Sequence, residues 1–356
     1  MPTPDITPLF QSATALLQEL IQTPSVSRQE ADAAALIRRA LTRAGLTPHA
    51  CGCNTWAQAP RFVPGRPTLL LNAHIDTVRP ADGWTRPPFQ PTMEADRLYG
   101  LGSNDCGGGL VSLLQVFCHY AQAPDSCAYN LVFLASAEEE VSGRGGIEMA
   151  LPQLPPVDVA LVGEPTGMHP AVAEKGLVVI DAVAHGRAGH AARNEGDNAL
   201  YHAVDDIQRL RHYRFSRISP LLGPVKLSVT LIQAGTQHNV IPAECRYTLD
   251  VRTNELYTNE EVVSLLRHEV SATLTPRSVR LQSSAIPANH PLVRRAIALG
   301  RTPFGSPTLS DQALMPFPSL KMGPGQSARS HTADEYITLT ELREGIELYL
   351  QLLAAG

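Results

Sequence analysis

The sequence predicts a doubly wound α/β domain that is split by an inserted α+β sandwich domain. Three observations favour this fold: short apolar runs alternate with helical periodicity in the first half, longer strand-like runs begin near Gly176, and the strand–helix alternation returns after Pro287. The chain has 356 residues, more than one hydrophobic core usually holds. We therefore expect one domain formed by residues 1–175 and 288–356, with the insert at 176–287.

The elements of the first part follow from their periodicity. Apolar residues at helical spacing predict a helix over 8–22. Ser27-x-x-Glu30 has the spacing of a capping box before a second helix, which should end near Gly45. Apolar runs predict buried strands at 69–73, 131–135 and 157–162, and a glycine-rich turn leads into a helix through 111–120.

The insert and the last part are predicted in the same way. In the insert, we expect a helix over 198–210 and strands at 177–183, 225–232 and 246–251. After the insert, we expect a helix from Pro291, a short strand around Leu320 and an amphipathic helix over 339–353.

Composition narrows the function classes. The formal net charge of -5 gives no overall basic field, which argues against nucleic acid and favours a small polar substrate. No apolar run approaches the roughly 18 residues that cross a bilayer, and residues 1–6 lack the pattern of a signal peptide. We therefore expect a cytoplasmic protein without a membrane segment. The six cysteines show no paired Cys-x-x-Cys spacing, so we expect reduced thiols.

A histidine and an aspartate follow one predicted strand closely. His74 and Asp76 stand at the end of the run 68–71, at the edge where open α/β sheets place their chemistry. Residues two apart on a strand point to the same side, so the carboxylate could orient a metal-bound imidazole. An isolated pair of this kind is also typical of two polar groups that simply satisfy each other.

Further ligand-type residues lie at predicted strand ends and loops, and they are Asp105, the run Glu138–Glu139–Glu140, Glu164 and His331. Each has an ordinary structural explanation when taken alone. Together, their convergence would leave unbalanced negative charge that divalent cations would neutralise. Nitrogen and carboxylate ligands suit zinc, cobalt or manganese, and a two-metal site needs one carboxylate that bridges both ions.

By these motifs the chain resembles the co-catalytic zinc exopeptidases and deacylases, a family that includes acetylornithine deacetylase, succinyl-diaminopimelate desuccinylase, aminoacylase and related carboxypeptidases. The motifs run from His74 to His331 in the family's order. The resemblance implies a zinc-peptidase-like catalytic domain, a lid or dimerisation insert, and two divalent metal ions, with zinc favoured. It implies that one metal is held by His74, Asp105 and Glu164. The other would be held by Asp105, Glu140 and His331, with Asp76 orienting His74.

The same resemblance assigns the remaining roles in this domain. Glu139 would be the general base, although the family's usual Asp-Glu-Glu is Glu138–Glu140 here, so a shift of one residue stays open. The peptide bond after Asp105 is expected to be cis. Leu101 and Gly107 stand where the family often has arginine and lysine, and we expect these differences to concern the subfamily rather than the metal chemistry.

The insert carries residues that the resemblance connects with substrate. His190, in the motif Gly186–His190, would reach across a homodimer and stabilise the oxyanion. Asn239 and Arg252 would bind substrate, since a guanidinium is a natural fork for a carboxylate. An internal salt bridge is the other explanation for Arg252.

The expected activity is removal of an acyl group from the α-nitrogen of an amino acid, with N-acetylornithine, of arginine biosynthesis, or N-acylcitrulline as substrate. Succinyl-diaminopimelate desuccinylase and a dipeptidase or carboxypeptidase are the alternatives with the same metal centre. A metal-binding protein without catalytic activity is the alternative from another class, and it would have no need of a base at Glu139.

Overall fold

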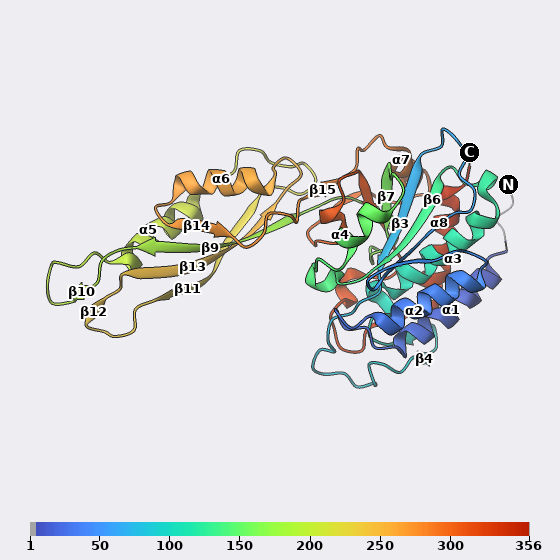
Figure 1. The fold of residues 1–356 in the computed structure, drawn as a ribbon, viewed down its shortest axis with the longest axis horizontal. Helices are drawn as coiled ribbons and strands as arrows, with labels where there is room; N and C mark the ends of the chain where they lie inside the picture. Colours follow the sequence, from blue (N-terminus) through green and yellow to red (C-terminus); the bar gives the residue numbers. More distant parts are fainter. Residues whose placement is uncertain (1–4, 356) are drawn as a thin grey trace. The chain divides into compact units, whose positions relative to one another are not determined.

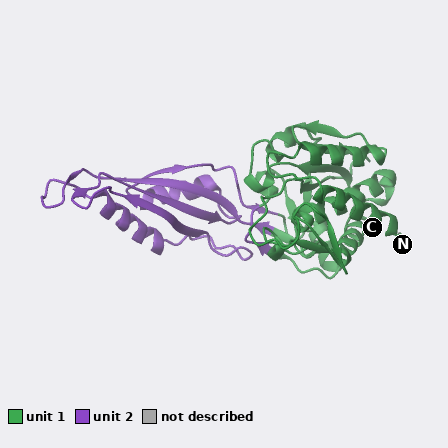
Figure 2. Ribbon diagram, turned by 90° about the horizontal axis from the view of Figure 1, so that it is seen from below, with its two compact units in different colours: residues 1–172, 286–304, 310–356 green, residues 173–285, 305–309 purple. Residues whose placement is uncertain are grey.

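The computed structural model describes residues 5–355, which form two compact units (Figures 1 and 2). Unit 1 holds the residues up to 172, residues 286–304 and those from 310, and unit 2 holds 173–285 and 305–309. The segment 305–309 was expected in the first domain. It packs with the insert instead, where the amide of Lys175 donates to the carbonyl of Ser306. Residues 1–4, part of the segment in which no signal peptide was expected, lie outside the described residues.

Unit 1 is built on a large mixed sheet, which confirms the α/β class. Its strands are, in spatial order, β1 (His49–Cys51), β2 (Asn54–Gln58), β6 (Asn130–Ser136), β3 (Thr68–His74), β7 (Val159–Val162), β17 (Ser319–Lys321) and β8 (Ala171–Glu174). The four strands from β6 to β17 are parallel, and β1, β2 and β8 join antiparallel. At the unit boundary, β8 also pairs with β15 (Ser284–Ala285) and β16 (Phe304–Ser306).

The central strands are buried on both faces, as expected for parallel strands between layers. In β3, Leu69 and Leu71 join the larger core cluster and Leu70 joins a smaller one, because successive side chains point to opposite faces. The larger cluster is completed by α1 (Thr7–Ile21), α2 (Ala31–Arg43), α3 (Gly108–Gln122), α7 (Pro291–Ala298) and α8 (Leu339–Leu353). The smaller cluster includes α4 (Ile147–Ala150).

Within residues 5–355, the loops of unit 1 contain six short helical turns. They are η1 (Ser103–Gly107), η2 (Pro124–Ser126), η3 (Glu139–Val141), η4 (Leu151–Gln153), η5 (Asp311–Leu314) and η6 (Ser327–Arg329). A small sheet has the order β18 (Tyr336–Thr338), β5 (Arg97–Tyr99) and β4 (Thr92–Glu94).

The capping box predicted before α2 is wrong. The residue that precedes the helix is Glu30, with φ -91° and ψ 4°, and no side chain caps this helix end. Ser27 is instead engaged with the loop after β3, where its amide donates to the carbonyl of Thr77 at 3.2 Å. The end of the helix is as expected, because Gly45 adopts the left-handed φ of +77° that suits glycine.

Unit 2 is a two-layer α+β sandwich, as predicted. Its antiparallel sheet has the order β11 (Lys226–Ala234), β13 (Glu244–Thr253), β9 (Gly176–His185) and β14 (Thr273–Pro276). Two helices, α5 (Ala199–His212) and α6 (Asn259–Glu269), supply apolar residues to the core with the sheet. Helix α6 was missed, although Thr258 and Glu261 form a complete capping box at its start. A ribbon of β10 (Gly189–His190) and β12 (Val240–Ile241) completes the unit.

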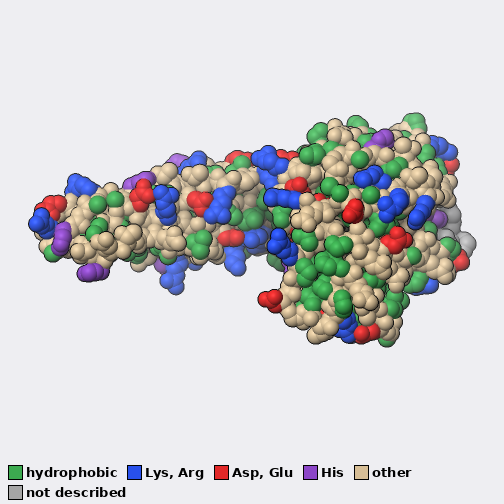
Figure 3. Space-filling view, turned by 60° about the horizontal axis from the view of Figure 1, so that its bottom comes forward, with side chains coloured by type: hydrophobic (Ala, Val, Ile, Leu, Met, Phe, Trp, Pro, Cys, Tyr) green, Lys and Arg blue, Asp and Glu red, His purple; other side chains and the backbone are tan. Residues whose placement is uncertain are grey.

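The helices and the charged side chains of the described residues can be compared with what a membrane segment requires. None of the helices there combines the length and the apolar character needed to cross a bilayer. On the face drawn in Figure 3, basic and acidic side chains are interspersed on each unit.

Candidate metal centre

The parallel strands bring the predicted ligands of unit 1 together. His74 is the last residue of β3, the run Glu138–Glu140 follows β6, and Glu164 follows β7. Neighbouring parallel strands end at the same edge of a sheet, so these loops meet there. Asp105 joins them from the turn before α3, and His331 from the loop before β18.

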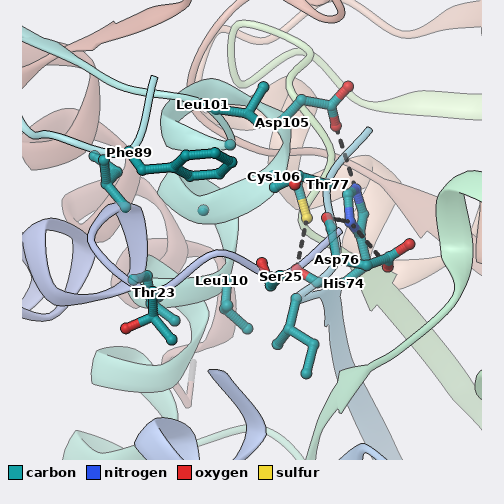
Figure 4. Close-up of a pocket in the computed structure, with 15 residues that line it drawn as sticks. Thr23, Ser25, His74, Asp76, Thr77, Phe89, Leu101, Asp105, Cys106 and Leu110 are labelled. Carbon is teal, nitrogen blue, oxygen red and sulfur yellow. Dashed lines mark hydrogen bonds and ion pairs between the residues drawn. The ribbon is translucent and has the colours of Figure 1, made fainter. Parts of the chain in front are cut away.

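His74 forms one half of the centre. Its Nε2 atom lies 3.2 Å from Asp105 Oδ1 and 3.5 Å from Glu164 Oε1. Its Nδ1 atom lies 2.8 Å from the backbone carbonyl oxygen of Asp76. Because a carbonyl oxygen only accepts, Nδ1 carries the proton and Nε2 keeps its lone pair for a metal. Figure 4 shows the Asp105 carboxylate directed at the imidazole of His74, with Asp76 beside the same ring.

His331 forms the other half. Its Nε2 atom lies 2.9 Å from Glu140 Oε2 and 3.6 Å from Asp105 Oδ2. The two carboxylate oxygens of Asp105 therefore face one histidine each, which is the arrangement that a bridging ligand needs.

These separations match the spacing of ligands around a metal. In a tetrahedral zinc site with bonds of about 2.0–2.1 Å, neighbouring ligand atoms lie roughly 3.3 Å apart. The histidine–carboxylate separations in both halves, 2.9–3.6 Å, bracket that value. One ligand atom from each of His74, Asp105 and Glu140 also lies within 4.8 Å of the other two. The donor set therefore fits two cations.

The electrostatic environment of these side chains also favours bound cations. Burial, followed by the charge of Asp105, raises the pKa of Glu164 to about 8, and Glu164 Oε1 is buried without a hydrogen-bond partner. The hydrogen bond that His331 donates to the Glu140 carboxylate raises the pKa of His331 to about 9. Protons thus compensate for crowded carboxylates in the metal-free site, and divalent cations would replace them.

Glu139 belongs to this charge cluster, and Glu138 turns away from it. Burial raises the pKa of Glu139 well above its usual range, and the negative charges of Glu164 and Asp311 add to the effect. The carboxylate of Glu138 accepts the amide N–H of Gly145 at 3.3 Å instead. This geometry favours Glu139 over Glu138 as the base and leaves Glu140 with His331.

The loops that carry Asp105 and His331 are held together by residues that sequence reasoning did not single out. The buried carboxylate of Glu335 accepts the amide N–H groups of Gly102, Asn104 and Asp105 at 3.0, 2.8 and 2.9 Å. The Asn104 side chain in turn accepts from the amide of Gln326 at 2.8 Å. The Asp105–Cys106 peptide bond is cis, as expected.

A second buried carboxylate, Asp311, was also missed. Its carboxylate accepts a hydrogen bond from the hydroxyl of Ser136 at 2.6 Å, and that hydroxyl accepts one from the side-chain Nδ2 of Asn72 at 2.9 Å. Burial raises the pKa of Asp311 to about 6. The only signal in the sequence was a lone aspartate far from every recognised motif, which is too weak to place it here.

The centre is open on the side of His331. The side chain of His331 is 53% exposed, while that of His74 is 1% exposed. The cavity behind His74 that Figure 4 shows has a volume of ≈ 20 Å³. That is about enough for one water molecule. His331 is the most exposed of the predicted ligands.

The three remaining predicted site residues, His190, Asn239 and Arg252, belong to unit 2. The β10–β12 ribbon brings two of them together, because the amide of Ala191 donates to the carbonyl of Asn239 at 3.0 Å. The Nδ1 atom of His190 accepts the amide N–H of Ala192 at 3.1 Å, which leaves the proton on Nε2. The fork of Arg252 is filled by the carboxylate of Asp250, at 2.8 and 3.1 Å, so the internal salt bridge is present.

Comparison with known proteins identifies the family and agrees with the fold. Residues 70–355 match the family described as Peptidase family M20/M25/M40. Among solved structures, the chain is similar to an aminopeptidase from Bacillus cereus, with 17% identity, a TM-score of 0.78 and coverage of 97% of this chain and 98% of that one. It is also similar to a tripeptidase from Staphylococcus aureus, with 18% identity, a TM-score of 0.75 and 97% of each chain covered. A Bacillus subtilis protein described as a dinuclear metal binding peptidase from the M20 family has 17% identity and a TM-score of 0.74, with 97% of each chain covered.

Proposed function

The chain belongs to the M20/M25/M40 family of metallopeptidases, and on that premise we propose that it is a dinuclear amidohydrolase that deacylates N-acylated amino acids. N-acetylornithine or N-acylcitrulline is the proposed substrate. The observation that carries the proposal is Asp105, whose two oxygens lie 3.2 and 3.6 Å from the Nε2 atoms of His74 and His331.

Two divalent cations, with zinc proposed and cobalt or manganese as alternatives, would polarise the amide carbonyl and make water acidic enough to attack it. His74 and Glu164 would hold one of them, Glu140 and His331 the other, and Asp105 both. The family match and the ligand spacing support this assignment.

Glu139 is the proposed general base. Its carboxylate would take a proton from the attacking water and later give it to the leaving nitrogen. Its place among the proposed ligands supports this role, since the charges of Glu164 and Glu140 both act on its carboxyl group.

His190 is the proposed oxyanion donor. Its Nε2 carries the proton because Nδ1 accepts from the Ala192 amide, so the imidazole can donate to developing negative charge. We propose that it serves the active site of a partner subunit in a homodimer. Asn239 would contact substrate, and Arg252 would do so through Nη1, because Asp250 contacts its Nε and Nη2 atoms. We also propose a cytoplasmic location and no role for nucleic acid.

Mixing two inactive variants tests the cross-subunit role. Heterodimers of a His190→Ala chain and a Glu139→Gln chain would contain one site with both residues intact, so activity should partly return. If the mixture stays inactive after demonstrated subunit exchange, His190 does not act across the interface.

Peptide hydrolysis is the second candidate. It is supported by the comparisons, because the similar structures include an aminopeptidase, a tripeptidase and a dipeptidase from Saccharomyces cerevisiae. The same metal centre would serve it, and only the contacts to the substrate would differ. A succinyl-diaminopimelate desuccinylase would also share the metal centre and would differ from the proposed deacylase only in its contacts to the substrate.

A single assay separates these functions. The purified, zinc-loaded chain is mixed with a panel of N-acetyl and N-succinyl amino acids, dipeptides and tripeptides, and released amine is measured. Cleavage confined to N-acetyl amino acids supports the proposal, and cleavage of peptides alone replaces it with the second candidate. If nothing in the panel is cleaved while zinc binds, the chain is better explained as a metal-binding protein.

A further inference from the structure

The turn between α1 and α2 contacts the loops that carry the proposed base. Residues 25–30 run beside the end of β3, where the amide of Thr77 donates to the carbonyl of Ser25 at 2.9 Å and the amide of Ser27 donates to that of Thr77 at 3.2 Å. These residues lie outside the range 70–355 that matches the family. We call residues 27–30 the Ser27–Glu30 turn.

Ser27 contacts Asp76 directly. Its hydroxyl donates to Asp76 Oδ2 at 2.7 Å, and the Asp76 side chain is fully buried. The same carboxylate was expected to orient His74, but the backbone carbonyl of Asp76 makes that contact at 2.8 Å, while Asp76 Oδ1 lies 3.6 Å from the imidazole. The carboxylate is therefore available for other donors.

Those donors are backbone amides of the turn that holds the proposed base. Asp76 Oδ1 accepts the N–H of Glu139 at 3.0 Å, and Asp76 Oδ2 accepts the N–H of Glu140 at 3.1 Å. The backbone of this turn is unusual, since Glu138 has a φ of +54°. Hydrogen bonds to an ionised acceptor are about twice as strong as neutral ones, so Asp76 can fix this conformation.

Glu30 holds the residue at the start of the same turn. Glu30 is 1% exposed, and its Oε1 atom accepts the N–H of Arg28 at 2.6 Å and that of Glu138 at 3.2 Å. The backbone N–H groups of Glu138, Glu139 and Glu140 thus all donate to two buried carboxylates. These carboxylates are those of Glu30 and Asp76.

We propose that Ser27 and Glu30 are positioning residues for the Glu138–Glu140 turn, with Ser27 acting through the Asp76 carboxylate and Glu30 through the Glu138 amide. The proposal rests on the function proposed above for Glu139 and Glu140. In this role the two residues fix where the base and one metal ligand stand relative to His74.

Ser27→Ala tests the first contact in the full-length, zinc-loaded protein. Loss of a hydrogen bond to a group that supports a ligand typically costs about 10–100-fold in metal affinity or activity. We expect a loss of that size in zinc affinity, measured by competition with a chelator, and in kcat with KM unchanged. Amide hydrogen exchange should accelerate in the peptide that covers residues 137–142. Ser27→Thr keeps the hydroxyl and should restore all three quantities.

Ser126→Ala is the matched control. Ser126 is also half-buried, and its hydroxyl makes one hydrogen bond of 2.7 Å, to the carbonyl of Ala123 in a turn that carries no predicted ligand. This variant should leave zinc affinity, kcat and exchange of residues 137–142 as in the wild type. An effect as large as that of Ser27→Ala would overturn the proposal, because it would mark a general loss of stability.

A double-mutant cycle tests whether Ser27 acts through Asp76. In an Asp76→Asn background, Ser27→Ala should change zinc affinity by less than about twofold, since coupled residues are not additive. The proposal is refuted if the effects of Ser27→Ala and Asp76→Asn on zinc affinity are fully additive. It is also refuted if Ser27→Ala keeps the exchange rates and zinc affinity of the wild type. Glu30→Ala removes the acceptor of the Glu138 N–H and should accelerate exchange of that amide in either background, and unchanged exchange would refute the role of Glu30. Exchange and zinc affinity need no substrate, so a failure of the proposed activity would be seen separately, as a wild type that cleaves nothing.

Discussion

Replacing Glu139 by glutamine removes a proton acceptor and keeps the shape of the side chain. The backbone N–H of Glu139 still reaches Asp76 Oδ1 at 3.0 Å, so the turn should keep its conformation. His74, Asp105, Glu140, Glu164 and His331 are unchanged, so both metals should still bind. A general base contributes about 10²–10⁴ in rate, equivalent to about 3–5 kcal/mol of transition-state stabilisation. We therefore expect kcat to fall by about 10²–10⁴ with the metal content preserved.

The stability of the Glu139→Gln variant gives an independent measurement. The charges of Glu164 and Asp311 help to raise the pKa of Glu139, so an uncharged side chain relieves repulsion in the metal-free site. The metal-free variant should thus be at least as stable as the wild type at pH 8, which thermal unfolding will show.

Glu138→Gln is the control for this experiment. Its carboxylate accepts from the Gly145 amide at 3.3 Å and lies 4.0 Å from Arg28 Nε, on a side chain that is 71% exposed. A glutamine oxygen can still accept from that amide, and exposed ion pairs contribute little. We expect kcat within about twofold of the wild type. The reasoning is refuted if Glu138→Gln is the inactive variant and Glu139→Gln instead loses a metal, because the assignments would then be shifted by one residue.

The other predictions concern the metals, pH and the core. Asp105→Asn should weaken both metals, whereas Glu164→Gln should weaken one; metal content after dialysis distinguishes a bridging Asp105 from a ligand of one ion only. Zinc affinity should rise between pH 6 and 9, since the pKa of Glu164 is about 8 and that of His331 about 9, and both must lose protons on binding; a flat chelator-competition profile would contradict this. The raised pKa of Glu164 means that the folded metal-free protein keeps a proton that the unfolded chain releases near pH 4.5, so its Tm should fall as the pH rises from about 5 to 8, and a rising Tm would be the opposite sign. Leu71→Ala, at a fully buried position of β3, should cost about 2–5 kcal/mol in urea unfolding, and less than about 1 kcal/mol would show that the position is not in the core.

The local pattern of the chain was sufficient for most of the secondary structure. The predicted helix over 339–353 coincides with α8, and the apolar run at 69–73 lies within β3. Both depend on side-chain periodicity, which each segment carries within itself. Short strands such as β4 and β10 were missed, because two or three residues contain too little periodicity.

Ser27 and Glu30 show where local reasoning fails. The Ser-x-x-Glu spacing has a local meaning at a helix start, but here both side chains bond to groups that are far away in the sequence, Asp76 and the Glu138 amide. Competition between a local cap and a distant buried carboxylate is decided by packing, which the spacing does not contain.

The sequence by itself determined the α/β class, the inserted domain and the types of ligand, because residue chemistry and order along the strands specify them. Only the tertiary structure decided the distances between Asp105 and the two histidines, the contact of Glu138 with the Gly145 amide, the pairing of Arg252 with Asp250 and the supporting carboxylates Glu335 and Asp311. The physical reason is that these contacts join segments separated by tens to hundreds of residues, and their geometry depends on how parallel strands bring loop ends to one edge of a sheet.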